Sequence, residues 1–230
     1  MSYRSGSSYR QTIPSSQRGG CLPVFILVPA SALAIGLALM FGIGKLTSST
    51  SPSIAERGKT AHPGVLAPFF TPEVQYWGAD IEQWGEKWDL DPNLIATVMQ
   101  IESCGDPKAI SSAGASGLFQ VMPFHFKDGE DRFDPQTNAL RGLGYLKESL
   151  SESAGDVRLG LAGYNGGISI IQKEESHWPD ETQRYAEWGT GIYQEAVEGA
   201  AESTVLNQWL AHGGNRLCSQ ARQHLNQFQP

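Results

Sequence analysis

The sequence of 230 residues has only three cysteines, and it has no acidic residue before Glu56. It also has no excess of basic residues. All 24 acidic residues lie from Glu56 onward, together with 13 of the 17 lysines and arginines. The other four basic residues, Arg4, Arg10, Arg18 and Lys45, come earlier in the sequence. A protein that binds nucleic acid through its phosphates needs a basic surface. The composition therefore argues against nucleic acid as a partner, and a polyanionic ligand would have to be held by local contacts.

Charge is also missing from residues 21–44, a run of 24 positions. A helix of this length covers about 36 Å, at about 1.5 Å per residue, and a hydrocarbon core is about 30 Å thick. The apolar core of a secretory signal has only about 7–15 residues. We therefore predict a single transmembrane anchor at residues 21–44. The alternative is a cleaved signal, since Ser53-Ile54-Ala55 resembles a small-residue cleavage site.

The residues around this run predict its orientation. Residues 1–20 contain three arginines and no acid, and the positive-inside rule places such a segment in the cytoplasm. Residues 1–20 are thus predicted to be a disordered cytoplasmic tail, and residues 45–71, rich in Ser, Thr and Pro, a linker. The chain after the linker would lie on the exported side of the cytoplasmic membrane, in the periplasm or cell wall.

On this topology Cys104 and Cys218 both lie on the exported side, where disulfides persist. Two readings stay open for them. They form either a disulfide or two buried thiols, because free cysteine is among the most buried residue types. Cys21 lies at the cytoplasmic edge of the predicted anchor.

From about residue 72, apolar residues recur at a spacing of three and four, and the alternation typical of strands is scarce. Prolines and capping residues mark the starts of the expected helices. These starts are Thr71-Pro72, Asp91-Pro92, Asp134-Pro135, Asp156 and Pro179. We predict an all-α domain over residues 72–200, followed by a C-terminal helical extension over residues 201–230.

Glu102 stands at the end of the second of these helices, because Gly105 would stop the helix just beyond it. The negative end of the helix dipole and apolar neighbours such as Ile101 and Leu118 would both raise the pKa of this carboxyl. Cleavage of a glycosidic bond needs such a protonated acid beside the leaving oxygen. Taken alone, a glutamate at a helix end is more often a solvated residue, so the surrounding motifs decide its interpretation.

Four blocks of sequence follow one another in a fixed order. They are ESCGDPKAISSAGASGLFQVMP from residue 102, DPQTNALRGLGYL from residue 134, AGYNGG from residue 162 and ETQRY from residue 181. In this order and spacing they resemble the catalytic domain of soluble lytic transglycosylases and goose-type lysozymes, which form glycoside hydrolase family 23. The resemblance covers roughly residues 85–198, and four ordered blocks are far more specific than any one of them.

The resemblance implies a lysozyme-like α domain with a groove for alternating N-acetylglucosamine and N-acetylmuramic acid, and it implies that Glu102 is the single acid and base. The residues that match substrate-contacting positions of the family are Ser111, Gln120, Tyr164, Asn165 and Glu181. Their chemistry suits a sugar, because amides pair with acetamido groups and a tyrosine combines an apolar face with a polar tip. For Glu181 the family role is usually structural or a subsite contact.

The sequence departs from the family pattern around these motifs. Cys104 occupies a position that is usually small, Phe119 replaces a methionine and Gln183 replaces an arginine. Residues 124–126 are Phe-His-Phe where the family more often has Thr-Ala. His125 is interpreted as a loop or core histidine rather than a metal ligand, because no second ligand stands at a metal-like spacing. Nothing in the sequence suggests a cofactor.

Three functions remain on this interpretation. The leading one is a membrane-anchored peptidoglycan lytic transglycosylase that leaves 1,6-anhydro ends on N-acetylmuramic acid. A goose-type lysozyme-like hydrolase is the alternative, with a second carboxylate to direct water, and an inactive wall-binding scaffold is the third. The candidates for that carboxylate are Asp128, Glu130, Asp131 and Asp134. We expect no second acid in the groove from the matched motifs, and this favours ring closure by the substrate's own C6 hydroxyl.

Overall fold

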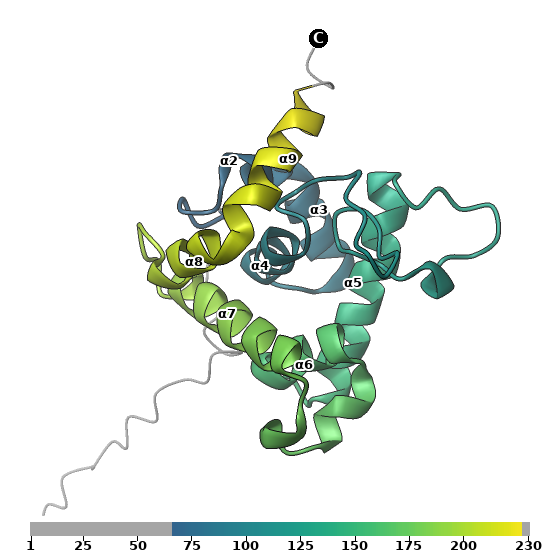
Figure 1. The fold of residues 1–230 in the computed structure, drawn as a ribbon, viewed down its shortest axis with the longest axis vertical. Helices are drawn as coiled ribbons and strands as arrows, with labels where there is room; N and C mark the ends of the chain where they lie inside the picture. The colour runs from purple at the N-terminus through teal and green to yellow at the C-terminus, as the bar shows by residue number, and fades with distance from the viewer. Residues whose placement is uncertain (1–65, 227–230) are drawn as a thin grey trace, which may run out of the picture. The chain divides into compact units, whose positions relative to one another are not determined.

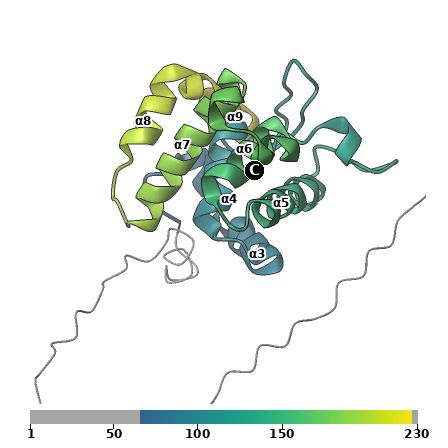
Figure 2. The same cartoon turned by 90° about the horizontal axis from the view of Figure 1, so that it is seen from below.

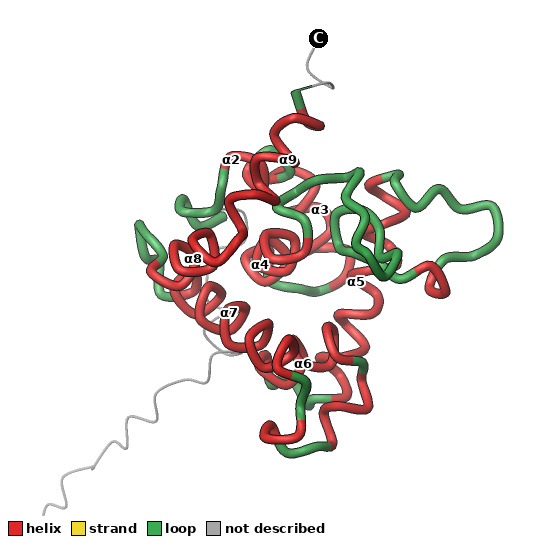
Figure 3. Tube along the Cα trace, in the orientation of Figure 1, coloured by secondary structure: helices red, strands yellow, loops and turns green. Residues whose placement is uncertain are grey.

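The computed structural model describes residues 66–226, and this part of the chain is helical without a β-strand (Figures 1 and 3). The all-α prediction is therefore confirmed for these residues. The predicted cytoplasmic tail, the anchor at residues 21–44 and most of the predicted linker lie outside the described residues. Between residues 66 and 226, no helix combines the length and the apolar character needed to cross a bilayer.

The helices in chain order are α2 (Pro72–Gln75), α3 (Gly78–Trp88), α4 (Pro92–Glu102), the 3-10 helix η1 (Pro123–His125), α5 (Pro135–Glu152), α6 (Val157–Gly166), η2 (Ile168–Gln172), η3 (Glu175–His177), α7 (Asp180–Val197), α8 (Thr204–Trp209), η4 (Leu210–Gly214) and α9 (Asn215–Leu225). Helix α6 packs against α5 and α7, and α7 packs against α4. The segment between η1 and α5 extends away from the helices in both views (Figures 1 and 2).

Helix α4 lies in the middle of the fold, and Figure 1 looks nearly along its axis. Its residues from Asn93 to Gln100 are all buried, including the polar Asn93, Thr97 and Gln100, so the helix is covered on every side. The start is the predicted one. The Asp91 carboxylate accepts a hydrogen bond from the Asn93 amide at 2.8 Å, and Pro92 fills the first turn.

Helices α5 and α6 begin in the same way. The Asp134 carboxylate accepts from the Thr137 amide at 2.8 Å, and the Asp156 carboxylate accepts from the Leu159 amide at 2.9 Å. Each satisfies one of the backbone amides that a helix start leaves without a partner. Helix α7 follows Pro179 and has no side-chain cap.

The helix predicted to start at Thr71 differs from the prediction, since it is divided into α2 and α3. Thr71 does not cap α2. Its hydroxyl donates to Gln100 Oε1 at 3.2 Å instead. Trp77 lies at the break between the two helices, and its indole Nε1 donates to the carbonyl of Gly105 at 2.9 Å. The break between α2 and α3 therefore places Trp77 in contact with the turn that follows α4.

The packed domain extends beyond the predicted bounds of residues 72–200. Leu66, Ala67 and Phe70, at the end of the predicted linker, are buried in the hydrophobic core, and the Ala67 amide donates to Asn93 Oδ1 of α4 at 2.8 Å. The C-terminal helices α8 and α9 join the same hydrophobic core. Their buried residues in that core are Leu206, Trp209, Cys218, Ala221 and Leu225.

Candidate active site

A cavity of about 270 Å³ lies at the C-terminal end of α4. It is lined by residues of α4, the loop after it, η1, α5, α6 and the first turn of α7. All six residues singled out from the sequence line it: Glu102, Ser111, Gln120, Tyr164, Asn165 and Glu181. Packing of α7 on α4 and α6 brings these distant segments together.

Glu102 is the last residue of α4, and the backbone turns sharply behind it. Cys104 has a φ of 53° and Gly105 a φ of 79°. A Cβ atom on Gly105 would lie 2.6 Å from the carbonyl oxygen of Glu73, so only glycine fits this position without a shift of backbone. The tight turn fixes where the helix ends and thereby where the Glu102 side chain enters the cavity.

The pKa of Glu102 is raised from its ordinary value to about 8. Burial is the largest cause, because it disfavours the charged form. The Tyr185 hydroxyl opposes the rise by stabilising the carboxylate, and the negative charge of Glu181 adds to it. The predicted rise is confirmed. A carboxyl group with this pKa is mostly protonated at neutral pH, as a general acid must be.

Tyr185 on α7 is a site residue that the sequence motifs did not identify, because a tyrosine on the apolar face of a helix is typical of a core position. Its hydroxyl is buried without a well-formed hydrogen bond among the described residues. Burial, and next the Glu102 carboxylate, raise the pKa of Tyr185 well above its usual value. A signal was present in the ETQRY block, since residues four apart on a helix share a face and Tyr185 follows Glu181 by that spacing.

Tyr164 and Asn165 lie at the end of α6. The Tyr164 hydroxyl donates to the carbonyl of Phe119 at 2.7 Å, and burial followed by the charge of Glu102 raises the pKa of Tyr164. Asn165 Oδ1 accepts from the Thr182 hydroxyl at 2.8 Å. These two contacts hold the end of α6 against the loop on one side and against α7 on the other.

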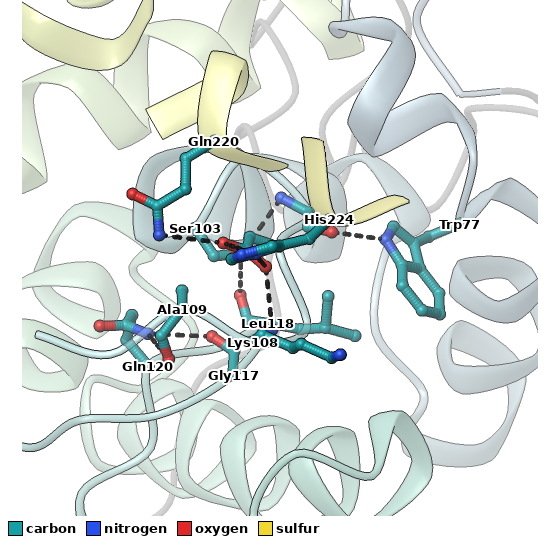
Figure 4. Close-up of polar contacts among 11 residues, drawn as sticks. Trp77, Ser103, Lys108, Ala109, Gly117, Leu118, Gln120, Gln220 and His224 are labelled. Carbon is teal, nitrogen blue, oxygen red and sulfur yellow. Dashed lines mark hydrogen bonds and ion pairs between the residues drawn. The ribbon is translucent and has the colours of Figure 1, made fainter. Parts of the chain in front are cut away.

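Ser111 and Gln120 stabilise the loop that forms one wall of the cavity. The Ser111 hydroxyl oxygen accepts from the Ala115 amide at 3.1 Å. Gln120 Nε2 donates to the carbonyls of Gly117 at 3.0 Å and Ala109 at 3.3 Å (Figure 4). Part of the hydrogen-bonding capacity of both side chains is therefore used within the loop.

The expectation that the matched motifs bring no second acid to the groove is wrong. Glu181 lines the cavity, and its charge acts on Glu102. The first turn of α7 carries it there, a placement that only the packing of α7 decides. The loop acids predicted as alternatives, Asp128, Glu130, Asp131 and Asp134, do not line the cavity. Glu130 instead pairs with Arg141 of α5.

Cys104 and Cys218 form a disulfide, with Cα atoms 5.0 Å apart. This decides between the two readings of the cysteines. Among residues 66–226, one cluster of potential metal ligands comes together, and it consists of these two cysteines and Glu73. Because both sulfurs are in the disulfide, neither is a free thiolate, the form of cysteine that ligates metal.

Comparison with known proteins agrees with this site. Residues 80–186 match the family model described as the transglycosylase SLT domain. The resemblance to lytic transglycosylases noted from the sequence is thereby confirmed for this segment. The matched residues include all of α4, α5 and α6 and the start of α7, which carry the cavity.

Individual relatives match over shorter shares of their length. A transglycosylase of Enterobacteria phage PRD1 is 35% identical over 111 residues, 47% of this chain and 40% of the relative. An endo-type membrane-bound lytic murein transglycosylase A of Klebsiella pneumoniae is 39% identical over 61 residues, 24% of this chain and 30% of the relative. The membrane-bound lytic murein transglycosylase C of Actinobacillus succinogenes is 29% identical over 121 residues, 44% and 34% of the two chains.

The chain thus spans well under half the length of these curated relatives. Among solved structures, an inactive variant of the lytic transglycosylase Slt from Pseudomonas aeruginosa is 21% identical. The match covers 61% of this chain and 24% of that one, with a TM-score of 0.40.

Proposed function

We propose that the chain is a peptidoglycan lytic transglycosylase, which cleaves the β-1,4 bond between N-acetylmuramic acid and N-acetylglucosamine and leaves a 1,6-anhydro end on the muramoyl sugar. The observation that carries this proposal is Glu102, with a pKa of about 8, at the cavity of an SLT domain. The names of the relatives, all transglycosylases, support the same reaction.

Glu102 would act twice. As a neutral acid it donates its proton to the glycosidic oxygen, so that the bond to C1 breaks and the glucosamine leaves with a free hydroxyl group. The resulting carboxylate then takes the proton of the muramoyl C6 hydroxyl while that oxygen bonds to C1. The substrate's own N-acetyl group would stabilise C1 between the two steps. The glutamate ends protonated, and no water is consumed.

Five residues around Glu102 would bind the sugars: Ser111, Gln120, Tyr164, Asn165 and Glu181. The amides of Gln120 and Asn165 suit acetamido groups. The Tyr185 hydroxyl, buried near Glu102 without a well-formed hydrogen bond, is a sixth candidate, because a buried donor gains most from a partner that arrives with the substrate.

The proposal includes a location. Residues 21–44 would anchor the chain in the cytoplasmic membrane, with the helical domain on the exported side. The Cys104–Cys218 disulfide supports that side, because disulfides persist in oxidising compartments and are rare in the cytosol. Two of the relatives are named as membrane-bound enzymes, which supports the anchor.

A hydrolase of the goose-type lysozyme kind is the second candidate, and Glu181 favours it. A hydrolase needs a base to direct water at C1, and Glu181 supplies a carboxylate at the same cavity. Ring closure has its own advantage, since a hydroxyl group already held in the substrate has a high effective concentration compared with water.

The products of purified peptidoglycan separate these functions. A transglycosylase releases muropeptides lighter by one water than those of a lysozyme digest, and these fragments resist borohydride reduction. Reducing muramoyl ends from the wild-type chain would establish the hydrolase instead. Binding to sacculi without release of any fragment would identify a wall-binding scaffold.

A further inference from the structure

Four aromatic rings form a continuous row that starts in the cavity and ends outside it. The ring centroids of Tyr164 and Tyr145 are 5.8 Å apart, those of Tyr145 and His125 are 4.6 Å apart, and those of His125 and Phe124 are 4.5 Å apart. The rings come from α6, α5 and η1, so three separate elements build the row. We refer to these four residues as the aromatic row.

The two ends of the row differ in their surroundings. Tyr164, Tyr145 and His125 line the cavity that contains Glu102. Phe124 does not line it, and 74% of this residue is exposed to solvent. Large apolar side chains with so much exposure are few in the described chain, and Phe124 is the most exposed of them. The row therefore continues the wall of the cavity onto the open surface.

The cavity is too small for a polymer. Its volume of about 270 Å³ is below the range of about 300–1,000 Å³ that is usual for drug-sized ligands. A glycan strand that places one glycosidic bond at Glu102 must therefore continue along the surface outside the cavity.

The chemistry of the row suits a neutral sugar ring. Burial lowers the pKa of His125, with Glu148 opposing the shift, so the imidazole is mostly neutral at neutral pH. A pyranose presents C–H bonds on its faces, and these pack on the electron-rich face of an aromatic ring. A protein partner would instead require a broad apolar patch, whereas Phe124 is a single exposed ring that continues an existing binding wall.

We propose that Phe124, at the outer end of the aromatic row, is a sugar-stacking platform that binds a pyranose ring of the glycan strand outside the cavity. This subsite rests on the proposed function, since it takes the same strand that Glu102 would cut. The Phe-His-Phe sequence that follows Met122-Pro123 is also where the chain departs from the family pattern, so the platform would distinguish this chain in its preference for longer strands.

The test measures binding rather than cleavage. The full chain carrying Glu102→Gln is titrated with a disaccharide and a hexasaccharide of alternating N-acetylglucosamine and N-acetylmuramic acid, with and without Phe124→Ala. We expect Phe124→Ala to weaken the hexasaccharide by about 3–10-fold, the size of one aromatic contact, and to leave the disaccharide unchanged. Phe124→Trp should retain the affinity for the hexasaccharide.

Tyr76→Ala is the matched control, since Tyr76 is an exposed aromatic residue, 49% accessible, that does not line the cavity. It should change neither affinity. Equal hexasaccharide affinity with and without Phe124, or an equal loss for both sugars, would overturn the platform while the proposed function stands. A chain that binds neither sugar would overturn both proposals. Thermal melting of each variant checks that an affinity change is not a loss of fold.

Discussion

Two carboxyl groups stand on either side of the turn that ends α4, and their surroundings are opposite. Asp106 is almost completely buried, and its oxygens accept hydrogen bonds from His224 Nδ1 at 2.8 Å, Gln220 Nε2 at 3.3 Å and the Lys108 amide at 2.9 Å (Figure 4). Glu102 is only partly exposed at the cavity, and its neighbours are one tyrosine hydroxyl and one carboxylate. Hydrogen-bond partners offset the cost of burying a carboxyl group such as that of Asp106, whereas an acid with few partners, such as Glu102, keeps its proton.

The Asp106 side of the turn is held by several elements. Ser103 Oγ donates to the carbonyl of Leu118 at 2.7 Å, and Trp77 donates to the carbonyl of Gly105 (Figure 4). The partners from α9 lie beyond residue 186, outside the family-matched segment. The C-terminal helix thus stabilises the same turn that positions the proposed acid.

The largest expected effect comes from exchanging the two carboxyl groups for amides. Glu102→Gln removes the proton donor, so release of fragments from peptidoglycan should fall by about 10²–10⁴-fold or more. Asp106→Asn should retain most of the activity and lower the free energy of unfolding by about 1–3 kcal/mol, because donors lose their carboxylate. Clearing in peptidoglycan gels and denaturant unfolding measure the two effects. If Asp106→Asn were fully folded and yet inactive, Asp106 would not have a purely structural role, and the difference between the two carboxyl groups would not hold.

The same Glu102→Gln variant tests the raised pKa through stability. The glutamate has its ordinary pKa of 4.5 in the unfolded chain, whereas burial raises the pKa of Glu102 to about 8 in the folded one. Between these values the folded state binds more protons, so wild-type stability should fall as pH rises. Glu102→Gln cannot ionise. Its melting temperature relative to wild type should therefore increase from pH 4.5 to pH 8, and a constant difference would contradict the raised pKa.

The disulfide should give a large effect on stability alone. Cys104 and Cys218 are separated by 114 positions, and the chain-entropy model assigns about 4–5 kcal/mol to a loop of this length. Cys218→Ser, or reduction, should lower the melting temperature accordingly. A count of free thiols under denaturing conditions is the control, since two thiols in the untreated protein would mean that the bridge had not formed.

The smallest effect is a shift in the pH profile. Activity should fall as pH rises through about 8, where Glu102 loses its proton. Tyr185→Phe removes the hydroxyl that stabilises the carboxylate, so this basic limb should move to higher pH. Tyr193→Phe, on the same helix, is the control, because the Tyr193 hydroxyl donates to Asp91 Oδ2 at 3.1 Å. If the fall in activity at basic pH stays at the same pH in Tyr185→Phe, the Tyr185 hydroxyl does not stabilise the Glu102 carboxylate.

Local chemistry explains what could be predicted from the sequence. The Asp-Pro pairs at residues 91 and 134 each start a helix, and Gly105 lies in the turn that follows the end of α4 at Glu102. The residues of the cavity could be named because ordered motifs carry them. Helix periodicity identifies an inward-facing residue without its neighbours, so it places Tyr185 on the apolar face of its helix and does not show that this residue lies beside Glu102. The role of α9 depends on contacts between residues more than a hundred positions apart.

The Cys104–Cys218 bond also changes what a protease can do to this domain. Every residue of the cavity wall except Glu102 lies between the two cysteines in sequence, inside one covalent ring. A single cut in that ring, for example in the extended segment between η1 and α5, opens the chain but releases no fragment, because the two pieces remain joined through sulfur. Packed helices would then hold the cut ends in place, and only a reductant together with the cut would separate Glu102 from Tyr164, Asn165 and Glu181.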